Sequence, residues 1–347
     1  MATKTTTEKN KTPKELSGGD VKAIEELRAS YEDITSEVGK IIIGQDAVIE
    51  RMLTCMLSRG HALLMGVPGL AKTLLVNSLA QTTSLSFGRI QFTPDLMPSD
   101  VTGTEILQST GEGLVREFVF AKGPLFANVI LADEINRTPP KTQSALLEAM
   151  QEKRVTVAGK HHVLPEPFFV LATQNPIEQE GTYPLPEAQL DRFMFNVVID
   201  YLPEDEEVEV VQQTTTTPAK PGKPIFNAKA MLRFIDLVRK VPVAEDVSRY
   251  AVRLAAASRP LQEDTLEYVD KWVNWGAGLR AAQFLVLGAK ARALLLGATH
   301  VTVEDVQALA LPVLRHRILV NYRAEAEGIT TEKVIEHLLE TIPSEIK

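Results

Sequence analysis

The sequence predicts an α/β protein in which helices flank a parallel sheet and a helical domain follows. From Gly60 to Tyr201, apolar strand-like runs alternate with amphipathic helix-like runs, a pattern typical of parallel sheets covered on both faces. A glycine-rich loop, Gly66–Thr73, joins one such strand to one such helix. After this region only helical periodicity recurs, at residues 228–240, 244–258, 280–296, 303–315 and 331–341.

Composition divides the 347-residue chain into four segments. Residues 1–20 are mostly Thr, Lys, Glu, Gly and Pro, too poor in apolar side chains to offset the entropy of ordering, and we expect a flexible tail. Residues 21–201 form the expected α/β core. Residues 202–224, which end in the Thr- and Pro-rich run Thr214–Pro224, are interpreted as a linker. Residues 225–347 form the expected helical domain.

Composition and charge argue against several classes of protein. The net charge of −8 argues against a broad electrostatic footprint for nucleic acid. Cys55 is the single cysteine, which excludes a disulfide framework and a thiolate metal cluster, and its helical pattern predicts a small core residue. No histidine has the spacing of a zinc site. Because no apolar run approaches the ~18 residues that span a bilayer, and no signal-peptide core is present, we expect a cytoplasmic protein.

The loop Gly66–Thr73 follows the apolar run Ala62–Met65 and precedes a helical run. In such a loop successive backbone N–H groups point at a phosphate, and the helix N-terminus adds favourable partial charge. Lys72 would reach the β- and γ-phosphates of a nucleotide, and the Thr73 hydroxyl would hold Mg²⁺. Ala71 stands where the motif has a second glycine, and we expect it to be tolerated only with a negative φ. The alternative is an ordinary Gly/Pro turn before a helix.

Polar side chains follow two further apolar strands. The run 126–132 ends in Asp133 and Glu134, and carboxylates at the carboxyl end of a parallel strand face the crevice where ligands bind. Asp133 can hold Mg²⁺ through its water shell, and Glu134 can orient or deprotonate a water for attack on a γ-phosphate. Asn175, after the strand 168–173, can hold that water together with Glu134. The alternatives are a solvated acidic pair and an Asn that starts a turn.

Two arginines are candidates for stabilising the charge of phosphoryl transfer. Arg192 lies at the end of the α/β region and is either a surface residue paired with Asp191 or an arginine finger offered to a neighbouring subunit. Arg280 begins a helix of the C-terminal domain, from which it can reach down onto the nucleotide. For both side chains surface solvation is the alternative.

Two insertions interrupt the α/β alternation. A Gly-rich piece and an alternating run within residues 89–126 indicate a hairpin inserted around a helix. Residues 154–164 alternate around a short Gly-containing turn and indicate a second hairpin. Insertions of this kind often face a partner. In the C-terminal domain, Tyr268, Trp272 and Trp275 recur at helical spacing and indicate a packed stripe.

These motifs resemble those of AAA+ ATPases of the MoxR family over roughly residues 21–343. The resemblance is carried by Ile43-Gly44-Gln45, Gly66–Thr73, Asp133–Arg137, Pro139–Gln143, Leu146–Glu152, Ala172–Pro176, Pro186–Phe193 and Leu314–Arg317. The run from Asp133 to Glu152 is far more specific than any single motif.

The resemblance implies a AAA+ P-loop core with a parallel sheet, flanking helices and two β-hairpin inserts, followed by an all-α lid, with ATP between core and lid. The implied nucleotide contacts are Ile43, Gly44, Gly66, Pro68, Gly69, Leu70, Ala71, Lys72, Thr73 and Leu74, with Thr73 and Asp133 at Mg²⁺. The implied catalytic residues are the Walker B residue Glu134, sensor 1 Asn175, the arginine finger Arg192 and sensor 2 Arg280. Ala71 is a substitution that this family commonly carries, whereas Leu279 stands where the family often has Pro.

The resemblance also implies an assembly and a task. Proteins of this kind usually form hexameric rings with ATP at the subunit interfaces. They couple Mg²⁺-dependent ATP hydrolysis to chaperone-like remodelling, maturation or activation of a client protein, often one with a von Willebrand A domain.

Two other functions stay open. A nucleic-acid-bound AAA+ motor, helicase- or loader-like, would track a strand with basic hairpin tips. The insertions here mix basic with acidic side chains, which disfavours that motor: Arg89, Arg116, Lys122, Arg154 and Lys160 with Asp95, Asp100, Glu105, Glu112 and Glu117. A nucleotide-gated scaffold that hydrolyses ATP negligibly would not need Glu134, Asn175 and Arg192 together. We therefore expect a protein client, no nucleic acid and no membrane insertion.

Overall fold

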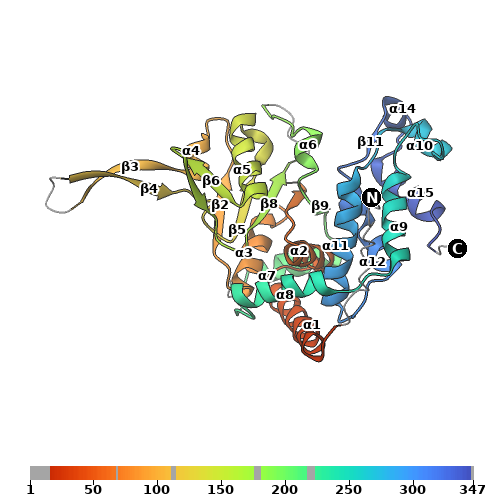
Figure 1. Ribbon diagram of the computed structural model, residues 1–347, viewed down its shortest axis with the longest axis horizontal. Helices are drawn as coiled ribbons and strands as arrows, with labels where there is room; N and C mark the ends of the chain where they lie inside the picture. Colours follow the sequence, from red (N-terminus) through yellow and green to blue (C-terminus); the bar gives the residue numbers. More distant parts are fainter. Residues whose placement is uncertain (1–15, 68, 111–114, 176–180, 217–222, 345–347) are drawn as a thin grey trace, which may run out of the picture.

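A computed structural model describes residues 16–67, 69–110, 115–175, 181–216 and 223–344 (Figure 1). Within these ranges the chain has the two expected parts, an α/β core and a mainly helical C-terminal domain that lies beside it. A long hairpin projects from the core on the side away from the helical domain.

The core is built on a five-stranded sheet. Its strands are β1 (Ala62–Met65), β2 (Phe87–Gln91), β5 (Val129–Asp133), β8 (Phe169–Gln174) and β9 (Phe195–Val198). They lie in the order β2-β5-β8-β1-β9 and every neighbouring pair is parallel, which confirms the prediction. Alternate residues of β5 enter two different hydrophobic clusters, Val129 and Leu131 on one face, Ile130 and Ala132 on the other. Burial on both faces explains the continuous apolar runs of these strands.

Helices cover both faces of the sheet. One face carries α1 (Gly18–Gly39), α2 (Asp46–Leu57) and α3 (Lys72–Thr82), and the other carries α5 (Pro140–Glu152). Cys55 is fully buried on α2, as predicted for a core residue.

The flexible tail expected over residues 1–20 extends too far along the chain, because its last residues belong to a helix. Residues 1–15 lie outside the described part of the chain, but α1 already begins at Gly18. The Ser17 hydroxyl accepts a hydrogen bond from the Asp20 N–H, and the Asp20 carboxylate accepts one from the Ser17 N–H. This capping box gives the helix a defined start that composition alone does not reveal.

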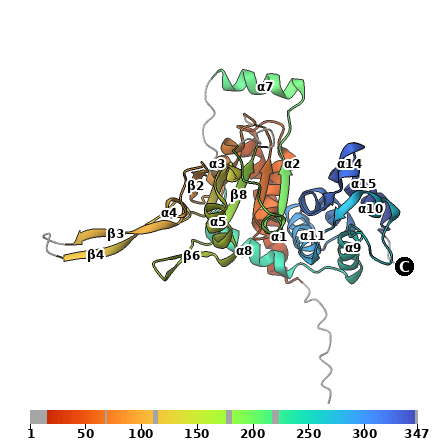
Figure 2. The ribbon, with the colours of Figure 1, turned by 90° about the horizontal axis from the view of Figure 1, so that it is seen from above.

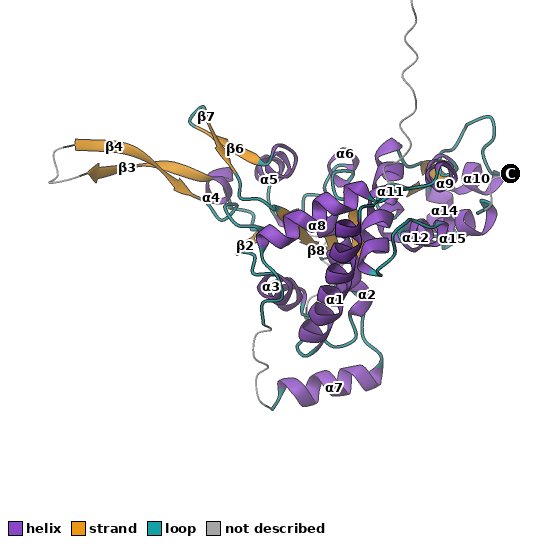
Figure 3. Ribbon diagram, turned by 60° about the horizontal axis from the view of Figure 1, so that its bottom comes forward, coloured by secondary structure: helices purple, strands orange, loops and turns teal. Residues whose placement is uncertain are grey.

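Both predicted hairpins are present, except that residues 111–114 lie outside the described ranges. The first follows the short helix α4 (Pro98–Thr102) and consists of β3 (Gly103–Thr110) and β4 (Val115–Lys122). The second consists of β6 (Arg154–Val157) and β7 (Lys160–Val163). The two hairpins extend from the same side of the core (Figure 3). They touch through an ion pair of 3.0 Å between Lys160 and Glu105 and through the stacked rings of His162 and Phe120.

The segment 202–224, expected as a linker, contains a helix, α7 (Glu204–Thr214). Figure 2 shows it standing apart from the other helices, beside the loops at one edge of the sheet. Residues 217–222 lie outside the described ranges. The helix follows Pro203 and has four acidic residues in its first turn, which suit the positive end of the helix dipole. The prediction of a linker rests on the Thr- and Pro-rich second half of the segment and does not account for the helix in its first half.

The C-terminal domain has eight described helices and one small antiparallel sheet. The helices are α8 (Ala228–Lys240), α9 (Glu245–Ala256), α10 (Glu267–Trp272), α11 (Leu279–Leu295), α12 (Val303–Ala308), α13 (Ala310–Leu314), α14 (Tyr322–Ala326) and α15 (Thr331–Thr341). The sheet pairs β10 (Val273–Trp275) with β11 (Leu319–Val320), so the domain is not entirely helical. None of the helices in the described part of the chain combines the length and the apolar character that crossing a bilayer requires.

Two local predictions in this domain are wrong. The helix expected over residues 303–315 is split at Leu309, because Pro312 has no N–H for the Ala308 carbonyl.

The aromatic residues Tyr268, Trp272 and Trp275 do not form one packed stripe on a helix. The helix α10 ends at Trp272, which is buried, and the following strand turns Trp275 outward, where its side chain is 68% exposed.

Candidate active site

The loop Gly66–Thr73 lies between β1 and α3, as predicted. A Cβ on Gly66 would lie 2.7 Å from the Ile199 carbonyl oxygen, so the loop can leave β1 only with glycine there. Gly69 has a φ of +90°, and Pro68 lies outside the described residues. Ala71 has a φ of +51°, which contradicts the expected negative φ. A left-handed alanine costs about 1–2 kcal/mol, which the contacts of the surrounding loop must offset.

Lys72 points back into the loop that precedes it. Its Nζ donates hydrogen bonds to the carbonyls of Gly66 and Val67. Partial burial lowers the pKa of Lys72, and the nearby carboxylates of Asp133 and Glu134 oppose this shift. The ammonium group is therefore within electrostatic reach of both acidic residues.

The predicted acidic pair lies at the carboxyl end of β5, and Thr173 of β8 connects its two members. The Thr173 hydroxyl donates to Asp133 Oδ1 at 2.6 Å and accepts from the Glu134 N–H at 2.8 Å. Glu134 has a φ of +55°, which turns its side chain out of the strand direction. The Glu134 carboxylate accepts from Gln91 Nε2 at 2.9 Å and from Arg137 at 3.1 Å.

Three site residues escaped the sequence prediction: Arg89, Gln91 and Thr173. Arg89 and Gln91 lie on one face of β2, which pairs with β5 so that Gln91 is level with Asp133. The Arg89 guanidinium lies 2.7 Å from Asp133 Oδ2 and also donates to Gln91 Oε1 at 2.7 Å. Arg89 and Gln91 are two residues apart, which predicts that they share one face of a strand. Only the strand order shows that this strand lies next to β5 and its acidic pair.

Asn175 joins the same site. It directly follows β8, which lies between β5 and β1, and its side chain is buried. At the end of β8, Gln174 is level with Met65, the last residue of β1. The Gly66–Thr73 loop, the acidic pair and Asn175 therefore meet at one edge of the sheet, the edge at which parallel α/β sheets bind ligands.

An apolar cavity of about 310 Å³ opens beside the loop. Its walls include Ile43 and Gln45 before α2, Gly69, Leu70, Ala71 and Leu74 of the loop and α3, and Glu207, Val210 and Val211 of α7. A Cβ on Gly44 would overlap the Glu206 carboxylate, and Gln213 of α7 donates to the Lys40 carbonyl at 2.7 Å. The described lining residues include none from α8 to α15. A nucleotide base here would lie under α7, not between core and lid as expected.

The donor set fits a nucleotide with Mg²⁺. Within the described ranges, no three His, Cys, Asp or Glu side chains are grouped to hold a metal by themselves. Thr73 and Asp133 offer a hydroxyl and a carboxylate, the hard oxygen ligands of a cation that completes its shell with water and phosphate. The apolar cavity beside the loop suits a purine base.

The two predicted arginines lie at the other edge of the sheet. Arg192 comes three residues before Phe195, the first residue of β9, which is level with Ala62 at the start of β1. The loop Gly66–Thr73 follows the opposite end of β1, about 10 Å away at the rise of a strand. Arg280 pairs with Asp191 at 2.8 Å. The structure thus places Arg280 beside the residue that precedes Arg192, away from the loop, and Asp191 pairs with Arg280 and Arg317.

Comparisons with known proteins identify the family of this chain. Residues 61–195 match the family described as ATPase family associated with various cellular activities (AAA), and residues 269–338 match the AAA lid domain. The chain is 44% identical to Chaperone MoxR1 of Mycobacterium tuberculosis, over 88% of this chain and 80% of that protein. It is 30% identical to Protein MoxR of Paracoccus denitrificans, over 92% and 98% of the two chains.

A solved structure supports the same assignment. The crystal structure of a putative ATPase from Cytophaga hutchinsonii matches with a TM-score of 0.86 and 45% sequence identity, over 93% of this chain and 97% of that one. The lid match explains the helical C-terminal domain, and the homologues indicate a chaperone-like ATPase. The chain belongs to the MoxR family of AAA+ ATPases.

Proposed function

We propose that this ATPase hydrolyses Mg²⁺-ATP at sites shared between neighbouring subunits of a hexameric ring, and that the cycle remodels a client protein. In this proposal one subunit supplies the loop, the acidic pair and Asn175. Its neighbour supplies Arg192 and Arg280.

The residues of the first subunit bind the nucleotide and prepare the attack. The loop N–H groups and Lys72 hold the phosphates, and Lys72 exchanges its loop carbonyls for phosphate oxygens. Thr73 and Asp133 would hold Mg²⁺, which would supply positive charge to the phosphate oxygens. Glu134 and Asn175 orient the attacking water, and Glu134 accepts its proton.

The main support for a shared site is that Arg192 lies at the end of the sheet opposite to the Gly66–Thr73 loop of its own subunit. An arginine finger must reach the γ-phosphate, and a side chain one strand length from its own loop is badly placed to do so. Arg280 is paired with Asp191 on the same edge, which supports its action on the neighbour's nucleotide as well. The ring of six subunits rests on the resemblance to the MoxR family.

The β3–β4 hairpin supports a protein client. Its described part exposes Ile106, Leu107, Phe118 and Val119, from 37% to 68% of each side chain. A two-stranded arm with apolar side chains on both faces suits contact with protein rather than with a phosphate backbone. By family resemblance, a von Willebrand A domain is the proposed kind of client.

A mixing experiment tests the shared site. Lys72→Ala subunits keep Arg192 but cannot hold the nucleotide productively, and Arg192→Ala subunits have the reverse defect. Each alone should be inactive in a phosphate-release assay, and mixtures should regain hydrolysis at interfaces that combine the intact halves. Failure of every mixing ratio to regain activity would count against the shared site.

A further inference from the structure

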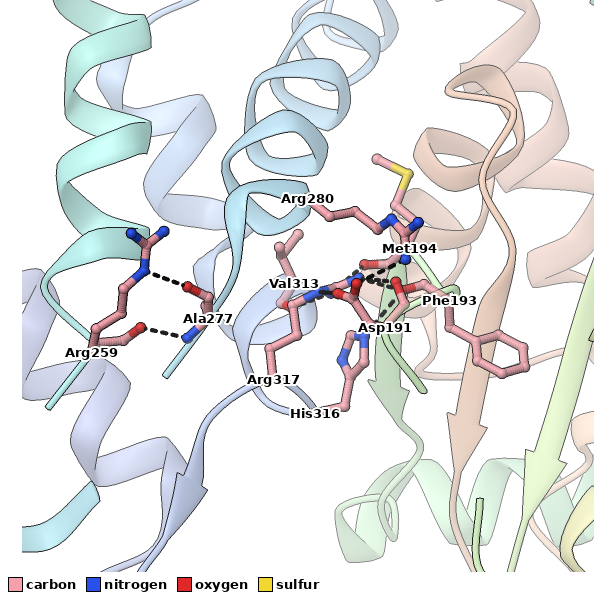
Figure 4. Close-up of polar contacts among 10 residues, drawn as sticks. Asp191, Phe193, Met194, Arg259, Ala277, Arg280, Val313, His316 and Arg317 are labelled. Atoms are coloured by element: carbon pink, nitrogen blue, oxygen red, sulfur yellow. Dashed lines mark hydrogen bonds and ion pairs between the residues drawn. The ribbon is translucent and has the colours of Figure 1, made fainter. Parts of the chain in front are cut away.

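Arg317 of the lid holds the backbone on both sides of Arg192 (Figure 4). Its Nη2 donates to the carbonyls of Asp191 at 2.9 Å and Phe193 at 2.7 Å, and its Nη1 donates to the Met194 carbonyl at 3.3 Å. Its Nε lies 2.7 Å from the Asp191 carboxylate. Only 2% of the Arg317 side chain is exposed. A planar guanidinium with this many satisfied donors fixes its acceptors rigidly.

Two further lid residues contact the same segment. The His316 Nε2 lies 3.0 Å from the Phe193 carbonyl. Burial lowers the pKa of His316, so its ring is neutral and carries its single proton on Nε2, the atom that donates to Phe193. Arg280 Nη1 lies 2.8 Å from Asp191 Oδ2, so two lid arginines share one carboxylate.

One side of this cluster borders a cavity. A cavity of about 540 Å³ lies at the seam between core and lid beside it, and its walls include Glu187, Trp275, Asp191 and Arg317. Phe193 and Met194 are buried in the hydrophobic clusters on the other side of the segment, so apolar packing holds it there but not on the cavity side. On the cavity side, the hydrogen bonds of Arg317, His316 and Asp191 connect the lid to the residues around Arg192.

We propose that Arg317 and Asp191 form a clamp that positions Arg192, so that the lid of one subunit sets the aim of the finger that it offers to its neighbour. This inference rests on the shared site proposed above. Arg317 is a positioning residue: it touches neither nucleotide nor water. Misplacement of a reacting or stabilising group by about 1 Å costs on the order of a hundredfold in rate, so loss of the clamp is a kinetic defect.

The test places clamp variants in chosen subunits of the mixtures. The finger donor is Lys72→Ala, and the nucleotide holder is Arg192→Ala. We expect Asp191→Asn or Arg317→Gln in the donor to lower the regained hydrolysis at least about tenfold. The same change in the nucleotide holder, which already lacks Arg192, should leave the regained hydrolysis within twofold of that of the unmodified mixture. Asp191→Asn is the milder variant and keeps the test valid if Arg317→Gln does not fold.

Arg292→Gln is the matched control. Arg292 also joins lid to core, through Glu50 at 2.9 Å, and binds Asp305 at 2.7 Å, away from the finger segment. Arg292→Gln should change the regained hydrolysis by the same factor in the finger donor and in the nucleotide holder. Equal losses in donor and holder for the clamp variants, or no loss in the donor, would overturn the clamp.

Hydrogen exchange separates failure of the clamp from failure of the shared site. If the mixture without clamp variants is inactive, the shared site is refuted. The clamp is then tested by hydrogen exchange within one kind of subunit. The Phe193 and Met194 N–H groups are hydrogen-bonded to Leu190 and His61. We expect Asp191→Asn to speed exchange at residues 191–194 about tenfold while α3 is unchanged. Unchanged exchange at residues 191–194 would overturn the clamp.

Discussion

The guanidinium of Arg89 lies 2.7 Å from Asp133 Oδ2. Asp133 is the carboxylate that we propose for Mg²⁺, so a bound cation and the guanidinium would compete for the same carboxylate. Arg89 is about half exposed and Asp133 is 13% exposed, so the pair contributes modestly, on the order of 1 kcal/mol.

Arg89→Ala should therefore make Mg²⁺ binding easier. We expect the Mg²⁺ concentration at half-saturation to fall by up to about fivefold, the equivalent of 1 kcal/mol. The measurement is a Mg²⁺ titration of fluorescent ATP-analogue binding, which does not depend on turnover. Arg116→Ala, on the exposed part of β4, is the control and should change nothing. A higher Mg²⁺ requirement in Arg89→Ala would contradict the competition.

Glu134→Gln should bind ATP and fail to turn it over. The amide keeps the size of the side chain but cannot accept the proton of the attacking water, and loss of a general base costs about 10²–10⁴ in rate. Phosphate release measures turnover, and analogue fluorescence measures binding. Glu148→Gln on the exposed face of α5 is the matched control. Parent-like hydrolysis by Glu134→Gln would remove Glu134 from the catalytic assignment.

Gly44→Ala should weaken nucleotide binding by straining the loop before α2 and pushing the Glu206 side chain of α7 aside. Gly44 has a φ of +70°, and a Cβ there would overlap the Glu206 carboxylate. We expect ATP affinity to fall about tenfold, or 1.4 kcal/mol, because α7 forms one wall of the base cavity. Gly39→Ala, where an added Cβ has no atom within 4 Å, is the control. Equal affinities of the two variants would show that α7 does not cover the nucleotide.

His61 should make stability fall in mild acid. It is buried, its Nδ1 accepts from the Val170 N–H at 2.9 Å, and burial lowers its pKa to about 4 from 6.5. Because the unfolded state binds the proton first, the contribution is complete above pH 6.5 and is lost as the pH falls toward 4, about 3 kcal/mol in all. Urea unfolding at several pH values measures it. His61→Asn should flatten that pH dependence, and an unchanged slope would count against this role.

The sequence was sufficient where a signal is local. The Gly66–Thr73 loop, the Asp133–Glu134 pair and Asn175 each follow an apolar strand, and parallel strands bring their carboxyl ends together. The helices α8 and α15 were predicted with the observed bounds because their caps and periodicity agree.

The missing parts depend on relationships between distant segments. Arg89 meets Asp133 only because β2 lies next to β5, and strand order is not encoded in either strand alone. The left-handed Ala71 is held by the loop around it, which overrides the preference of the residue. Arg280 meets Asp191 across the seam between lid and core, a contact that no local pattern predicts.

The structure of a Glu134→Gln assembly with Mg²⁺-ATP, determined by electron cryomicroscopy, tests the shared site most directly. The measured quantity is the distance from the Arg192 guanidinium to the nearest γ-phosphate, together with the identity of the subunit whose Lys72 binds that same phosphate. We predict a hydrogen-bond distance to a phosphate held by the Lys72 of the neighbouring subunit. An Arg192 that contacts the nucleotide of its own subunit, or none, would contradict the account.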